Sequence, residues 1–135
     1  MKATVVWQSS PEGLGFEGEM DNGHKLTLDG NGCGLSPMES VLISVGACSS
    51  VDVVEIMRKS RQDMHGCYCE LEAERAETAP RKFTKIHAHF VVQGNEISQK
   101  HLARAVQLST EKYCSVMLML TGNVDITTSF AIQST

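Results

Sequence analysis

Residues 36–61, SPMESVLISVGACSSVDVVEIMRKSR, carry the strongest structural signal in the chain. Ser36 can cap a helix that has Pro37 in its first turn, and Glu39 completes a capping box with Ser36. Apolar residues lie on nearly every side of the helix that follows, which is typical of a helix buried in the middle of a structure. Basic residues that suit a helix C-terminus mark its end: Arg58, Lys59 and Arg61. We therefore predict one long buried helix that tertiary packing must stabilise, since Val and Ser are poor helix formers.

On both sides of this helix the pattern predicts strands and one further helical segment. Asp21, Asn22 and Gly23 separate two such runs, and an Asn-Gly pair in that setting is a strong hairpin signal. Residues 98–120 have a helical period, but the pattern leaves open whether they form one helix or two that are broken near Tyr113. Strands are predicted at residues 2–8, 13–20, 24–29, 67–77, 83–92 and 124–132. The order β-β-β-α-β-β-α-β is an α+β fold.

Length and composition limit the class of protein. The chain has 135 residues, so we predict a single domain over residues 1–135. A formal net charge of −4 argues against nucleic acid as a partner, because phosphate binding needs a basic patch. No apolar run approaches the ~20 residues of a membrane span, and the N-terminus lacks the apolar stretch of a signal peptide. We expect a soluble, cytoplasmic protein that binds neither nucleic acid nor a membrane.

The main candidates for chemistry are the five cysteines, Cys33, Cys48, Cys67, Cys69 and Cys114. Their odd number and the lack of an export signal favour reduced thiols over a disulfide framework. Cys48 lies inside the long helix, where a thiol is either a small core residue or a nucleophile on a rigid scaffold. It lies too far from the helix start for the dipole to stabilise a thiolate, and Asp52 and Glu55 on the same face would disfavour one. A reactive Cys48 therefore needs an activating group from another element.

Cys114 allows two interpretations. If a helix starts just after Tyr113, Cys114 lies at its N-terminus, where thiolates are favoured. If the helix is continuous, Cys114 is a core thiol. Cysteines on two helices can also meet across a helix–helix contact, and Cys48 and Cys114 would then be an attacking and a resolving thiol.

The other candidates favour structural or incidental roles. A metal site would draw on His65, Cys67 and Cys69. No second cluster supplies a fourth ligand, so we expect no metal and no cofactor. Cys33 lies in a Gly-rich loop and is expected to be an exposed, incidental thiol. His87 and His89 alternate with apolar residues and are expected on the solvent-facing side of a strand.

Three segments of the chain resemble those of one known family. Residues 36–54, SPMESVLISVGACSSVDVV, are similar to the central-helix motif of the OsmC/Ohr superfamily, which carries a Cys late in a helix. EKYCSV, residues 111–116, resembles its second cysteine site, and PRKFTKIHAHFVV, residues 80–92, resembles the hairpin between them. The resemblance covers nearly the whole chain in the right order and is closest to the small YhfA-like branch.

The resemblance implies an assembly and a reaction. It implies an intertwined homodimer with a long central helix wrapped by sheets from both chains and two sites at the interface. It also implies a cysteine-based peroxidase that acts in the response to oxidative stress. Cys48 would attack the peroxide and become a sulfenic acid, and Cys114 would condense with it to a disulfide. A dithiol such as dihydrolipoamide would reduce the pair. A lining suited to small hydrophobic peroxides would consist of Val41, Val45, Val51 and Met117.

The chain departs from the family pattern around the thiols. The basic residues before Arg58 are Lys2, His24 and Lys25. None of them is the N-terminal Arg with which hydroperoxide reductases of the family stabilise the thiolate. The Glu after the Pro is replaced by Met38, and capping explains Glu39 one position later. The usual Pro after the second Cys is replaced by Ser115.

Three functions therefore fit the sequence. We favour a thiol-dependent redox protein that reduces peroxides, with lowered efficiency or a different oxidant because the Arg is missing. Alternatively, the dimer is a non-enzymatic module that binds an apolar ligand in its interface pocket, with Cys48 and Cys114 as structural residues. A metal-binding redox sensor would require bound zinc.

Overall fold

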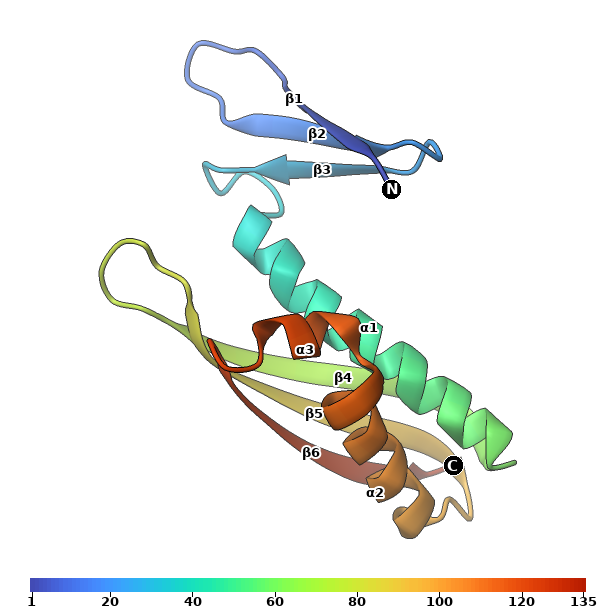
Figure 1. The fold of residues 1–135 in the computed structure, drawn as a ribbon. Coiled ribbons are helices and arrows are strands. Elements are labelled where there is room, and N and C mark those ends of the chain that lie inside the picture. Colours follow the sequence, from blue (N-terminus) through green and yellow to red (C-terminus); the bar gives the residue numbers. More distant parts are fainter. The chain divides into compact units, whose positions relative to one another are not determined.

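A computed structural model describes all residues from Met1 to Thr135 and confirms the predicted order of strands and helices (Figure 1). The elements are β1 (Ala3–Trp7), β2 (Gly15–Met20), β3 (Lys25–Asp29), α1 (Pro37–Lys59), β4 (Asp63–Arg75), β5 (Phe83–Asn95), α2 (Gln99–Leu108), the π-helical turn η1 (Ser109–Tyr113), α3 (Ser115–Leu120) and β6 (Asp125–Ser134). The strands form two three-stranded sheets, β1-β2-β3 and β4-β5-β6. The fold class is α+β, as predicted.

The chain divides into two compact units, Met1–Ile43 and Ser44–Thr135. The first unit holds the antiparallel sheet β1-β2-β3. The predicted Asn-Gly turn joins β2 to β3, and its Gly23 has a φ of +91°, a conformation that glycine adopts without strain. A single domain over residues 1–135 stays a prediction.

The start of α1 forms the predicted capping box. The Glu39 N–H donates to Ser36 Oγ over 3.1 Å, and the Ser36 N–H donates to Glu39 Oε1 over 2.9 Å. Hydrogen bonds from the backbone and side chain of Ser36 lower the pKa of the Glu39 carboxyl group, because they stabilise its ionised form. Helix capping therefore accounts for this exposed glutamate.

The second unit is a sheet with helices on one face. β4 pairs antiparallel with β5, and β5 pairs parallel with β6. Alternate residues of β5 point towards the helices and are buried, as the alternation in the sequence predicts. The buried apolar side chains of this unit include Val45, Val53 and Met57 of α1, Ile86, Ala88, Phe90 and Val92 of β5, and Leu102, Ala105 and Val106 of α2. This core places α1 and the segment from α2 to α3 side by side.

Within the single chain, α1 is buried along one stripe. The buried residues are Val45, Gly46, Ser49, Val53 and Met57. Two other apolar residues of the helix, Ile43 and Val51, are 55% and 57% exposed. By length and composition alone α1 could also cross a membrane, a property that the core helix of a soluble protein shares.

The helical segment whose continuity the sequence left open is broken. α2 ends at Leu108, and η1 leads to Cys114, whose backbone is extended with φ −73° and ψ 104°. The Cys114 N–H donates to the Ser109 carbonyl over 2.7 Å, which closes the π-helical turn. α3 begins at the next residue, so Cys114 is its N-cap.

We expect Ser36→Ala to lower the free energy of unfolding by about 1 kcal/mol, because it removes the side-chain acceptor at the start of α1. Urea denaturation followed by far-UV circular dichroism measures the change. Ser36→Asp keeps a capping oxygen and serves as the control, with stability close to that of the wild type. A Ser36→Ala protein as stable as the wild type would contradict the capping role.

Candidate functional site

Cys48 and Cys114 come from separate helical elements and meet in the second unit. Cys48 is half-buried on α1, and Cys114 is fully buried between η1 and α3. Cys48 lies near enough to Cys114 to raise the pKa of the Cys114 thiol. The structure therefore brings together the two residues that the sequence singled out, and their catalytic roles stay a prediction.

The environment of Cys114 favours the protonated thiol. Burial raises the pKa of Cys114 from 9.0 to about 11, and the adjacent Cys48 acts in the same direction. The backbone N–H groups of Val116 and Met117 act in the opposite direction, and the Met117 N–H lies 3.4 Å from the Cys114 sulfur. Cys114 therefore lies at a helix N-terminus, as one interpretation of the sequence had it, and is also a buried core thiol, as the other had it. Burial raises its pKa more than the N–H groups at the helix start lower it. No cation is among the groups that shift this pKa.

A buried serine connects the two elements that carry the thiols. Ser109, with no exposed surface, donates from its hydroxyl to the Ser49 carbonyl over 2.9 Å and lies 3.1 Å from a carboxylate oxygen of Asp52. Both acceptors belong to α1. The sequence analysis did not assign Ser109 to the site. The available signal was a serine at a position where the helical period favours an apolar side chain.

The hydrophobic lining expected around Cys48 is only partly available in the single chain. Val45 and Met117 are fully buried and belong to the core, and Met117 also lines a cleft with Thr110, Leu118 and Ile126. Val41 is half-buried and Val51 is exposed. A cleft of about 530 Å³ begins one helical turn beyond Cys48 and is lined by Asp52, Glu55, Ile56, Lys59, Leu108 and Tyr113. Its lining mixes apolar and charged side chains.

The residues considered as metal ligands do not converge. His65 bonds to Asp63 over 2.9 Å and to Thr135 over 3.1 Å. Cys67 lines a cleft together with residues of α1. Burial raises the pKa of Cys69 to about 11, which favours its protonated thiol. No three His, Cys, Asp or Glu side chains are grouped so that they could hold a metal ion. Cys33 is exposed, as expected.

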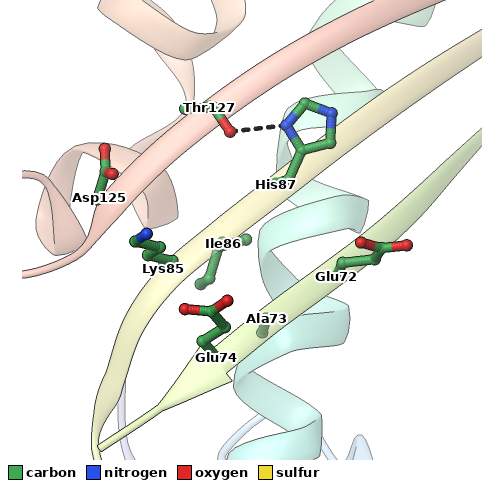
Figure 2. Close-up of a pocket in the computed structure, with 8 residues that line it drawn as sticks. All are labelled: Glu72, Ala73, Glu74, Lys85, Ile86, His87, Asp125 and Thr127. Atoms are coloured by element: carbon green, nitrogen blue, oxygen red, sulfur yellow. Dashed lines mark hydrogen bonds between the residues drawn. The ribbon is translucent and has the colours of Figure 1, made fainter.

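A second cleft, of about 340 Å³, lies on the face of sheet β4-β5-β6 that points away from the helices (Figure 2). His87 and His89 lie on this face, away from the buried side of β5, as the alternation predicts. His87 bonds to Thr127 over 2.6 Å, and both histidines bond to the hydroxyl of Ser129. The lining residues are Glu72, Ala73, Glu74, Lys85, Ile86, His87, Asp125 and Thr127. Because both ring nitrogens of His87 have hydroxyl partners, the arrangement is that of a hydrogen-bonded surface.

Comparison with known proteins relates the whole chain to one family. The model of the family described as OsmC-like protein matches residues 29–129. Protein YhfA of Escherichia coli (strain K12) is 49% identical over 134 residues, which are 98% of both chains. The crystal structure of a hypothetical protein from Aquifex aeolicus VF5 is 32% identical, with a TM-score of 0.86 over 100% of this chain and 98% of that one.

A more distant structure carries a name that refers to function. It is the organic hydroperoxide resistance protein OsmC from Legionella pneumophila, also described as a predicted redox protein and regulator of sulfide bond formation. Its TM-score is 0.70 at 16% identity, over 97% of each chain. At this identity the likeness concerns the fold.

We expect the stability of the protein to fall as the pH rises from about 9 to about 11. The folded state raises the pKa of Cys114 and of Cys69 to about 11, whereas the unfolded chain releases these protons near 9.0. The unfolded state then binds fewer protons, so stability present in full below pH 9 is lost as the pH rises. Urea midpoints measured across this range test the effect.

Cys114→Ser removes one of these thiols and is expected to flatten the loss between pH 9 and pH 11. The matched control is Cys33→Ser, since Cys33 is exposed. Equal pH profiles for Cys114→Ser and the wild type would contradict the assignment.

Proposed function

Because the chain belongs to the family of OsmC-like proteins, we propose that it is a thiol-dependent redox protein that reduces peroxides through Cys48 and Cys114. The observation that carries the proposal is the proximity of Cys48 and Cys114. Ser109 bonds to the turn of α1 that follows Cys48 and accepts the Cys114 N–H, and Cys48 raises the pKa of Cys114. The two cysteines are 66 positions apart in the chain, so it is the fold that brings them near each other. The relative named for organic hydroperoxide resistance supports a redox role in general.

The difference in burial supports the roles proposed for the two thiols. Cys48 is half-buried, whereas Cys114 has no exposed surface, so a peroxide reaches Cys48 first. Burial raises the pKa of Cys114, which keeps it protonated and unreactive towards peroxide at neutral pH. Cys48 is therefore the attacking thiol, and Cys114 is the resolving thiol.

The proposed reaction takes place in three balanced steps. The Cys48 thiolate attacks one peroxide oxygen, the O–O bond breaks, and the products are the Cys48 sulfenic acid and an alcohol after proton uptake. The Cys114 sulfur then attacks the Cys48 sulfur, a disulfide forms, and the sulfenic hydroxyl leaves with the Cys114 proton as water. Finally a dithiol, such as dihydrolipoamide, reduces the disulfide and is itself oxidised to a disulfide.

The lack of an N-terminal Arg that could stabilise the Cys48 thiolate lowers the rate of peroxide reduction that we expect. The thiolate form is the reactive species, and a nearby cation normally increases its population. The N-terminal strands contribute no Arg, since the first arginine of the chain is Arg58. We therefore expect small hydrophobic peroxides to be reduced slowly, or a different oxidant to be preferred.

We further propose that the protein is a cytoplasmic homodimer. In the first unit, Val5 on β1 and Leu26 on β3 are 64% and 50% exposed and lie in one row across Gly18. Their face encloses a cleft of about 320 Å³ lined mainly by apolar side chains. Exposed apolar patches of this kind mark interaction sites, and a second copy of the chain would cover them.

The same cleft supports the second candidate function, a non-enzymatic module that binds an apolar ligand. In that case Cys48 and Cys114 are structural thiols. The two functions differ in two measurable results. The module gains thermal stability with an apolar ligand and leaves peroxide unconsumed.

Mass spectrometry of the fully reduced protein after one equivalent of cumene hydroperoxide tests the proposed reaction. We expect a loss of two hydrogens, ~2 Da, that peptide mapping assigns to a Cys48–Cys114 disulfide. Cys114→Ser should stop at a sulfenic acid on Cys48 that dimedone traps, and Cys48→Ser should form neither product. Cys33→Ser, the matched control, should behave as the wild type. Five thiols that remain alkylatable after minutes would refute the peroxidase function and favour the ligand-binding module.

Sedimentation equilibrium tests the homodimer, and we expect twice the mass of the chain. Leu26→Glu should shift the protein towards monomer, because it places a charge in the apolar row. Val6→Glu is the matched control, since Val6 pairs with Glu17, which in turn pairs with Thr27, on the polar face of the sheet. A monomeric wild type, or equal masses for both variants, would refute this interface.

A further inference from the structure

Ser109 occupies the junction between the two thiol-bearing elements. It is the first residue of η1 and one of two buried polar residues in the chain, the other being Ser49. Its hydroxyl has a single proton, which lies between two acceptors on α1, the Ser49 carbonyl at 2.9 Å and the Asp52 carboxylate at 3.1 Å. Ser109 is therefore tied to the helical turn that follows Cys48.

The backbone of the same residue holds Cys114. The Ser109 carbonyl accepts the Cys114 N–H over 2.7 Å, the bond that closes the π-helical turn. Single π-helical turns inside helices occur frequently at functional sites. One residue thus links α1 through its side chain and Cys114 through its backbone.

A disulfide between Cys48 and Cys114 can form only if their sulfur atoms are placed accurately. The two sulfur atoms must approach to about 2.05 Å with a narrow range of Cα–Cα distances, and a misplacement of about 1 Å can slow a positioned reaction about a hundredfold. The hydroxyl of Ser109 is the side-chain contact between η1 and α1 that can hold Cys114 in this position.

We propose that Ser109 is the positioning residue for the resolving step, holding Cys114 against Cys48 through its hydrogen bonds to Ser49 and Asp52. In the step it supports, the Cys114 sulfur bonds to the Cys48 sulfur and the sulfenic hydroxyl leaves as water with the Cys114 proton. The inference rests on the proposed function for its role in peroxide reduction. The positioning itself can be measured without peroxide.

Quenched reactions of Ser109→Ala with one equivalent of cumene hydroperoxide separate the two steps. We expect loss of the free Cys48 thiol at nearly the wild-type rate, because Ser109 does not contact the peroxide. Closure of the disulfide should slow at least about tenfold, and dimedone should trap correspondingly more Cys48 sulfenic acid. If Ser109 only stabilised the fold, its replacement would not slow disulfide closure while leaving the oxidation of Cys48 at nearly the wild-type rate.

Thr110→Val is the matched control. The Thr110 hydroxyl bonds over 2.7 Å to the Val106 carbonyl, within its own helical segment, so its removal leaves the link to α1 intact. Closure should proceed at the wild-type rate in this variant. Ser109→Thr keeps the hydroxyl and should restore closure. If Ser109→Ala does not fold, Asp52→Ala tests the same link from α1, with a smaller slowing because the Ser49 carbonyl remains.

Equilibration with a glutathione redox buffer tests the positioning independently of peroxide chemistry. We expect the effective concentration of the Cys48–Cys114 pair to fall about tenfold in Ser109→Ala and to be unchanged in Thr110→Val. If the wild type closes this disulfide in glutathione but ignores peroxide, the peroxidase function fails and the positioning role stands. Equal effective concentrations in Ser109→Ala and the wild type, or no Cys48–Cys114 disulfide under either oxidant, would overturn the inference.

Discussion

The packing of one stripe of α1 in the core of the second unit is the constraint on which the rest of the site depends. A Cβ atom at Gly46 would lie 2.6 Å from a methyl carbon of Leu71 on β4, so glycine permits a close approach of helix and strand. The stripe continues through Ser49 and Val53, which are fully buried. Cys48 lies at the edge of this stripe, and this position makes it half-buried and open to a small reactant.

The two thiols have different chemistry because they lie in different surroundings. Cys114 sits in the core at the break between two helical segments, where desolvation raises its pKa more than nearby backbone N–H groups lower it. A thiol that stays protonated beside a more accessible partner suits the second step of a two-cysteine reaction. The polar link from Ser109 to α1 crosses the same core, where an unpaired hydroxyl would be costly, so its hydrogen bonds are also structural.

Local signals predicted much of the fold because each depends on few neighbouring residues. The Ser36–Glu39 capping box and the turn at Gly23 appear in the structure as expected. The break before Cys114 could not be predicted, since helical spacing continues through it and a π-helical turn has no strong local signal. The full burial of Val45 and Met117 could not be predicted, because a helical wheel gives the direction of a side chain but not what covers it.

By itself, the sequence determined the order of strands and helices, the capped start of α1 and the candidacy of two of its five cysteines, because periodicity, turn chemistry and residue type are local properties. Only the tertiary structure decided that Cys48 and Cys114 lie near each other, that burial raises the pKa of Cys114, and that Ser109 connects their elements. These are properties of segments some sixty residues apart in the chain. Contact and desolvation depend on which segments the core brings together, and no local pattern encodes that.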